Sequence, residues 1–177
     1  DEHFDRFQGA FLDSRRVDVD PRLFTIFAQT ECDFAICENG GGIWFPTINR
    51  IPTLAMNMYP YNMSKPGVVH YFKALERDDG AFVDSLSLFK DFAFRHLQPG
   101  YRLANITKDE ITAAVCDFVQ HLENPNSYGY PISNVCECPG DVNIRVTDGR
   151  VSPVWAAIYG KGSHKSEIQK ILEKYLS

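Results

Sequence analysis

The hydrophobic pattern near the start of the chain predicts four elements in a definite order. Asp20 and Pro21 suit the cap and the first turn of a helix, whose buried side would carry Leu23, Phe24, Ile26 and Phe27. The next stretch, residues 32–37, is short, mostly apolar and free of helix breakers, which is typical of a strand buried on both faces. Three glycines follow; then the apolar run 43–48 predicts a short helix and residues 51–57 predict a second strand.

A strand, a glycine turn, a short helix and a strand together predict a parallel crossover unit and therefore an α/β fold. The glycines would lie at the carboxyl end of the first strand, where open α/β sheets bind their ligands. The helix that begins at Pro21 would pack beside this strand, as helices do in doubly wound sheets.

The most regular helical pattern lies further along, where Thr107 and Glu110 form a capping-box signature. The helix behind it should end before Pro125 and bury the apolar residues at helical spacing, which are Ile111, Ala114, Val115, Phe118, Val119 and Leu122. Residues 68–75 suit either a strand or a helix, and the Asp-Asp-Gly of residues 78–80 predicts a turn.

The two ends of the chain show less regular patterns. Residues 1–20 predict an irregular lead-in, because no period connects their aromatic and charged residues. Toward the other end, a short β segment is expected near residues 142–146, and short helices are expected over 154–159 and 166–176.

Composition and charge narrow the class of protein. Of 177 residues, 44% are hydrophobic and 23% are charged, which is ordinary for a globular protein. The length suits a single domain. We expect its core over about 18–123 and a loop-rich and helical part over 124–177. With 18 basic and 23 acidic residues the net charge is −5, and without a basic stripe a nucleic-acid partner is not favoured. No apolar run approaches the ~18 residues of a membrane helix and no secretory signal opens the chain, so we expect a cytoplasmic protein without a transmembrane segment.

The loop after the first predicted strand is the first candidate site. Glycine lets backbone amides approach an anion closely and a helix amino terminus adds partial positive charge, so residues 38–43 suit a phosphate-bearing ligand. The spacing fits neither GxGxxG nor a Walker loop, and by itself it favours a tight, left-handed structural turn. Glu38 lies between the strand end and the glycines. At this position it could hold a ligand hydroxyl, act as a base or cap the short helix.

The loop that follows the second predicted strand, residues 58–67, should face the same edge of the sheet. An aromatic side chain there would stack on a base or a sugar, and Lys65 would pair with a phosphate. The alternative is a surface loop whose tyrosines pack on the domain.

No metal site is expected from the cysteines. Cys136 and Cys138 are too close for the usual zinc spacing, and no second pair completes four ligands. Cys32 and Cys37 suit small core residues, and Cys116 falls on the side of its helix that is expected to be buried.

Two stretches carry a resemblance to the carboxyl-terminal part of GT-B glycosyltransferases, especially a bacterial family of the surface-polysaccharide type. The first is RLFTIFAQTECDFAICENGGGIWFPTINRIPTLAMNMYPY, which is similar in its helix, its strand ending in a small-residue loop, its short helix and its strand ending in Asn and aromatics. The second is LANITKDEITAAVCDFVQHL, which is similar to the acid-capped helix that follows in that family. The resemblance covers roughly residues 18–123, with a weaker echo at GRVSPVWAAIYG.

The resemblance implies a Rossmann-like, donor-binding half of such an enzyme, an incomplete lobe without its first strands. It implies transfer of a sugar from a nucleotide-sugar donor to a glycan acceptor in polysaccharide biosynthesis, without a metal or other cofactor, and with helix-terminus amides stabilising the leaving diphosphate. A missing N-terminal lobe is then an expected partner. The implied catalytic residue is Glu38, and the implied donor-binding residues are Asn39, Gly40, Gly41, Gly42, Asn57, Tyr59, Tyr61 and Lys65.

Two other functions are compatible with the same residues. One is a non-catalytic α/β interaction domain in which the glycine loop is only a turn. The other is a small hydrolase that uses Glu38 as its acid or base.

Overall fold

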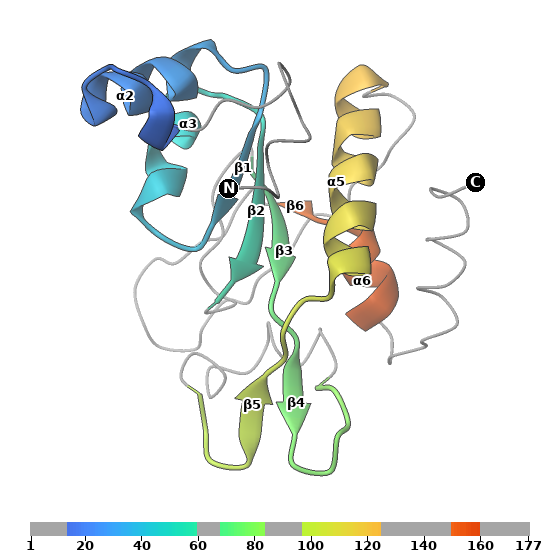
Figure 1. The fold of residues 1–177 in the computed structure, drawn as a ribbon. Helices are drawn as coiled ribbons and strands as arrows, with labels where there is room; N and C mark the ends of the chain where they lie inside the picture. The colour runs from blue at the N-terminus through green and yellow to red at the C-terminus, as the bar shows by residue number, and fades with distance from the viewer. Residues whose placement is uncertain (1–13, 60–67, 84–96, 125–149, 160–177) are drawn as a thin grey trace, which may run out of the picture.

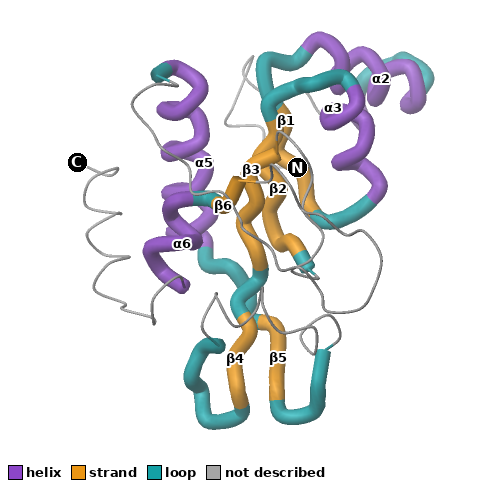
Figure 2. The backbone as a smooth tube through the Cα atoms, turned by 180° about the vertical axis from the view of Figure 1, so that it is seen from behind, coloured by secondary structure: helices purple, strands orange, loops and turns teal. Residues whose placement is uncertain are grey.

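A computed structural model describes residues 14–59, 68–83, 97–124 and 150–159 (Figure 1). The fold is mixed α/β and is built on a four-stranded sheet whose neighbouring strands are all parallel. In spatial order the strands are β1 (Ala35–Glu38), β2 (Thr53–Met58), β3 (Val68–Phe72) and β6 (Arg150–Val151). Two pairs of helices lie on opposite sides of these strands (Figure 2), namely α2 (Pro21–Glu31) with α3 (Trp44–Ile48), and α5 (Lys108–Glu123) with α6 (Pro153–Tyr159).

The predicted crossover unit is confirmed. Strands β1 and β2 run parallel, with Ala35 opposite Thr53 and Glu38 opposite Met56. The connection between them consists of the 3-10 turn η2 (Gly41–Ile43) and helix α3. Ile43 is 1% exposed and belongs to the hydrophobic core, so the connection is anchored to the sheet directly after the glycines.

The prediction that residues 32–37 form a strand buried on both faces is wrong. Strand β1 begins at Ala35, pairs with β2 alone in the described part of the sheet, and alternates between half-buried and exposed residues, with Ile36 46% exposed. Cys32 and Cys37 are accordingly half-buried. The strands buried on both faces are β2 and β3, because a continuous apolar run does not by itself say which strand is central.

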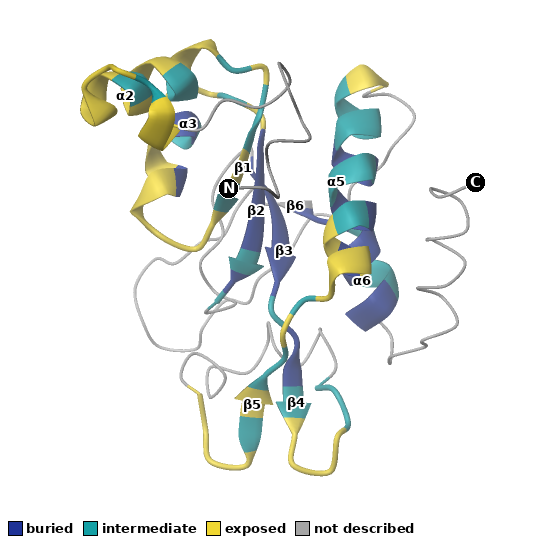
Figure 3. Ribbon diagram, viewed as in Figure 1, coloured by how far each residue is buried: buried dark blue, intermediate teal, exposed yellow. Residues whose placement is uncertain are grey.

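Helix α2 begins as predicted but packs differently. The Asp20 carboxylate accepts a hydrogen bond from the Arg22 backbone N–H at 2.8 Å and thereby caps the helix. No residue of α2 is buried, and the expected buried side is wrong, since Leu23, Ile26 and Phe27 are 62%, 45% and 64% exposed (Figure 3). The amphipathic pattern predicts a face that prefers burial, but the described chain provides no layer to cover that face.

Helix α5 has the predicted capping box, formed by Thr107 and Glu110, and ends at Glu123, before the expected proline. The buried face of α5 differs from the predicted one. Ile111, which was expected to be buried, is 42% exposed, and two acids are among the buried residues. The fully buried residues of the helix are Glu110, Ala113, Ala114, Asp117 and Phe118. Helix α5 contacts α6.

The buried Glu110 carboxylate connects three elements of the core. Its Oε1 accepts hydrogen bonds from the hydroxyls of Tyr71 on β3, at 2.8 Å, and Tyr159 on α6, at 2.7 Å. Its Oε2 accepts from the Thr107 backbone N–H at 2.8 Å and from the Thr107 hydroxyl at 2.7 Å. Burial and, after it, the neighbouring Glu110 raise the pKa of both tyrosines above the usual value.

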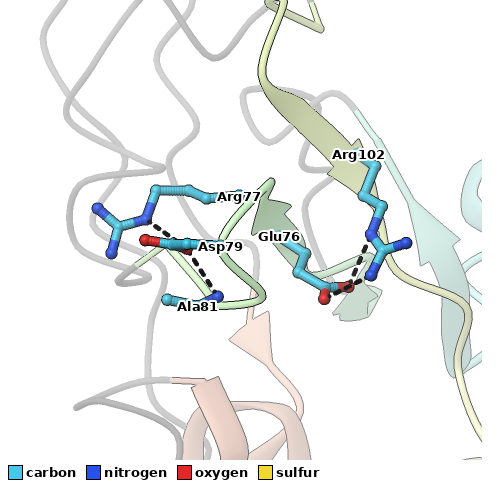
Figure 4. Close-up of polar contacts among 5 residues, drawn as sticks. All are labelled: Glu76, Arg77, Asp79, Ala81 and Arg102. Atoms are coloured by element: carbon cyan, nitrogen blue, oxygen red, sulfur yellow. Dashed lines mark hydrogen bonds and ion pairs between the residues drawn. The ribbon is translucent and has the colours of Figure 1, made fainter.

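An antiparallel ribbon of β4 (Leu75–Arg77) and β5 (Tyr101–Leu103) extends beyond the carboxyl end of β3 (Figure 1). Its exposed ion pairs are Arg102 with Glu76 at 2.7 Å and Arg77 with Asp79 at 3.5 Å (Figure 4). Asp79 also accepts a hydrogen bond from the Ala81 backbone N–H, which closes the predicted turn at residues 78–80.

Several expectations lie outside the described residues. They concern Tyr61, Lys65, the Cys136 and Cys138 pair, the segment 142–146 and the helix 166–176. The helix expected at 154–159 is confirmed as α6. In the part of the chain that the structure describes, no helix combines the length and the apolar character that crossing a bilayer requires.

Candidate functional site

Four of the predicted site residues come together where β1 and β2 end. Glu38 is the last residue of β1 and Asn57 lies near the end of β2, so the parallel pairing brings their side chains to the same edge. Asn39 and Tyr59 directly follow these strand ends and contact each other. This edge is where open α/β sheets place their ligands.

Glu38 and Asn57 form a hydrogen-bonded pair. The Asn57 side-chain amide donates from Nδ2 to Oε1 of Glu38 at 2.7 Å, and the bond is exposed to solvent. Asn57 has a left-handed backbone, with φ of 55°, at a point where the register between β2 and β3 shifts. Asparagine tolerates this conformation better than most residues, so the residue type suits the irregular strand end.

A second bridge joins the two strand ends. The Asn39 side-chain amide donates to the backbone carbonyl oxygen of Tyr59, which holds the start of the glycine loop against the chain that leaves β2. The Tyr59 ring is half-buried and packs against the hydrophobic core, and its burial raises the pKa of the phenol. For Tyr59 the structure agrees with the alternative prediction, in which the tyrosine packs on the domain.

The glycine loop is open and is not left-handed. Gly40 is extended, with φ of 171°, and neither Gly41 nor Gly42 has a positive φ, so the predicted left-handed turn is wrong. A Cβ atom added at any of these three glycines would meet no atom of the described residues within 4 Å. The fold itself therefore does not require glycine here, and the backbone is accessible from that side.

The loop also presents backbone donors. The first turn of the connection is closed by the Ile43 N–H, which donates to the Gly40 carbonyl at 3.4 Å, and by the Trp44 N–H, which donates to that of Gly41. The amides of Gly41 and Gly42 precede these bonds, so they have no partner within the turn. Two adjacent N–H donors in an open loop favour an anion.

The observed contacts reduce the number of roles that Glu38 can have. The prediction that it caps the short helix is wrong, because neither η2 nor α3 has a side-chain cap. Its hydrogen-bond partner is an amide and not a second acid, which removes support from the hydrolase hypothesis. Within the described ranges, no group of three or more His, Cys, Asp and Glu side chains is arranged to hold a metal ion.

One aromatic residue next to the site is missing from the predicted set. Trp44 lies two residues after Gly42 and is 54% exposed, although Ile43 in η2 and Pro46 in α3 are buried. The sequence signal is an aromatic two residues after the last glycine, which hydrophobic periodicity assigns to the core.

Comparisons of the chain with protein-family models, with curated proteins and with solved structures found no match. The function is therefore inferred from the geometry where β1 and β2 end.

Proposed function

We propose that the chain is the donor-binding, Rossmann-like half of a GT-B-type glycosyltransferase, which transfers a sugar from a nucleotide-sugar donor to a glycan acceptor. The observation that carries this proposal is the open loop with the amides of Gly41 and Gly42, directly beside the paired Glu38 side chain. The loop lies at the carboxyl end of a parallel strand, the usual ligand position in α/β sheets.

In the proposed reaction the donor diphosphate lies over the glycine loop. Negative charge grows on this diphosphate as the bond to the anomeric carbon breaks, and the Gly41 and Gly42 amides stabilise it without first reorienting. Glu38 is the proposed catalytic base: its carboxylate accepts the proton of the acceptor hydroxyl as that oxygen bonds to the anomeric carbon and the diphosphate leaves. Asn39 fixes the loop to the end of β2 through its bond to Tyr59, so the donors stay in place.

Calorimetric titration with UDP, GDP and CMP tests the proposal. The wild-type chain should bind one of these nucleotides, and Gly41→Asp should weaken that binding about tenfold or more, because a carboxylate in the loop repels the phosphates. Gly41→Asn is the matched control, since it has the same shape without the charge. Both variants should fold, because a Cβ atom at position 41 meets no described neighbour within 4 Å.

Two results would contradict the proposal. One is no binding of any of the three nucleotides at millimolar concentration. The other is equal affinity of the wild-type and Gly41→Asp chains, because the diphosphate would then lie elsewhere.

A specific observation also favours the interaction-domain hypothesis. Seven large apolar side chains on β1, α2 and α3 are exposed, and an exposed apolar set of this kind marks many interaction surfaces: Leu23, Ile26, Phe27, Ile36, Trp44, Phe45 and Ile48. A chain that forms a stable dimer in sedimentation experiments, loses it in Phe27→Lys and binds no nucleotide would support this function instead of the glycosyltransferase.

A further inference from the structure

Helices α2 and α3 present one apolar surface to the solvent. The two helices lie on the same side of the sheet and contact each other (Figure 2). Both are largely exposed (Figure 3). Six of their large apolar side chains are exposed, and we call this set the α2–α3 face: Leu23, Ile26, Phe27, Trp44, Phe45 and Ile48.

Helix α2 has little to stabilise it without a cover on this face. It has 11 residues, none of which is buried, whereas isolated helices shorter than about 12–15 residues are barely stable in water. Leu23, Ile26 and Phe27 follow helical spacing, so they form one stripe along α2. Most helices in proteins are stabilised by the packing of such a stripe, so we expect another surface to cover it.

The α2–α3 face is large enough for a protein interface. Its six residues are between 40% and 74% exposed. With about 200 Å² for a large apolar residue that is fully exposed, they present on the order of 700 Å² to the solvent. The largest apolar patch on a typical monomer measures roughly 300–600 Å². One side of a standard interface covers about 800 Å², which is close to the area of this face.

The charges favour a second copy of the chain as the cover. Each copy has a net charge of −5, so two copies approach most easily through a surface of low charge. Helices α2 and α3 carry only two charged residues, Arg22 and Glu31, and these have opposite signs. A membrane suits this face less well, because helices that lie on membranes are rich in Lys and Arg on their polar side.

We infer that the α2–α3 face joins two copies of this chain in a dimer with two-fold symmetry. In such a dimer the same surface of each copy contacts the other, so the apolar side chains of the two faces cover one another. The inference goes beyond the proposed function and does not depend on it, because the proposed phosphate site uses backbone amides of the glycine loop.

Sedimentation velocity of the full chain, from about 0.1 to 100 μM, tests the inference. The wild-type chain should change from monomer to dimer with a dissociation constant below about 10 μM, since interfaces of this size reach micromolar affinity or better. Phe27→Lys on α2 and Ile48→Lys on α3 should each raise this constant about tenfold or more. Each substitution places two unpaired charges, one from each copy, in an apolar contact.

Thr25→Lys is the matched control. Thr25 is exposed on the same helix, but it lies two residues before Phe27 and therefore points about 200° away from it. This variant should dimerise like the wild-type chain. Urea unfolding at concentrations below the dissociation constant should give similar free energies for all four chains, because the substituted side chains are exposed in the monomer.

Several results would overturn the inference. One is a chain that stays monomeric at 100 μM, because the face would then be covered by another segment of the chain or by a different partner. Another is a dimer that Phe27→Lys and Ile48→Lys weaken no more than Thr25→Lys does. Association beyond the dimer would contradict a closed two-fold contact. A monomer that floats with vesicles of phosphatidylcholine and phosphatidylserine, but not as Phe27→Lys, would assign the face to a membrane.

This inference and the proposed function can fail separately. If the chain dimerises through the α2–α3 face but binds none of UDP, GDP and CMP, the dimer stands and the glycosyltransferase proposal is overturned. If a monomeric chain binds one of these nucleotides and Gly41→Asp weakens that binding, the proposed function stands and the dimer is overturned.

Discussion

The two sides of this molecule differ in how far their residues are buried. In the core region (β2, β3, α5 and α6) every residue of β3 is buried, and the largest buried side chains include Trp155 and Phe118. In the flank (β1, α2 and α3) no residue of α2 is buried, and β1 alternates between half-buried and exposed positions. Figure 3 shows this contrast as dark strands beside a largely exposed pair of helices.

The candidate site lies at the junction of these two regions. The flank contributes Glu38 and the glycine loop, and the core region contributes Asn57 from β2. A mostly buried strand thus holds, through a residue with a left-handed backbone, the carboxylate of a more exposed strand. Burial is therefore concentrated in the core region, whereas the proposed ligand site depends on the more exposed flank, and each prediction below tests one side of that division.

The largest expected difference compares one phenylalanine from each region. Phe118 is 2% exposed, and the centroid of its ring lies 6.0 Å from that of Phe34. Phe27 on α2, in contrast, is 64% exposed. Phe118→Ala should lower the free energy of unfolding by about 3–5 kcal/mol, because it leaves a cavity. Phe27→Ala should change it by less than about 0.5 kcal/mol. Urea unfolding measures both, and a similar loss for the two variants would contradict the division.

A smaller but still large effect is expected at the buried carboxylate of α5. Glu110→Ala leaves two tyrosine hydroxyls and the Thr107 amide without their acceptor, which should cost about 3 kcal/mol of unfolding free energy. Glu123→Ala, at the exposed end of the same helix, is the control and should cost less than about 0.5 kcal/mol. Equal losses would mean that the buried hydrogen bonds do not stabilise the core region.

The pH dependence of stability gives the smallest effect. Burial, with Glu110 beside it, raises the pKa of Tyr71 above its usual value of 10.0. The folded chain then holds this proton more tightly than the unfolded chain, so the free energy of unfolding should fall as the pH rises above about 10, by up to ~1.4 kcal/mol per pH unit for each such tyrosine. In Tyr71→Phe the fall should be shallower. Unfolding curves that decline in parallel for both chains would contradict the assignment.

Local signals in the sequence predicted the helix starts correctly. The Asp20 cap with its following proline and the capping box of Thr107 with Glu110 involve residues only a few positions apart, and both are observed. The crossover between β1 and β2 follows from short segments and is also confirmed. A Rossmann-like topology stays a proposal.

The errors concern contacts between distant segments. The two tyrosine partners of Glu110 lie 39 and 49 residues away in the sequence, so nothing near the helix indicates that this acid is buried. Likewise, the apolar side of α2 is visible in the sequence, but whether a neighbouring layer covers that side depends on the rest of the fold.

The candidate site was predictable in position and not in detail. Parallel strands end at the same edge, so the meeting of Glu38, Asn39, Asn57 and Tyr59 follows from the strand prediction. The left-handed backbone of Asn57 and its bond to Glu38 depend on the irregular register with β3, which single-strand patterns do not contain. Tyr61 and Lys65 lie outside the described residues, so their roles stay predictions.

The most direct measurement is nuclear magnetic resonance of the amide-labelled chain during titration with UDP, GDP and CMP. One of these nucleotides should shift the amide signals of Gly41, Gly42 and Asn57. Gly80 and Gly100, in the exposed turns of the β4–β5 ribbon, serve as internal controls and should not move. Signals that move on α2 instead, or signals at Gly41 and Gly42 that stay in place at saturating nucleotide, would contradict a ligand site where β1 and β2 end.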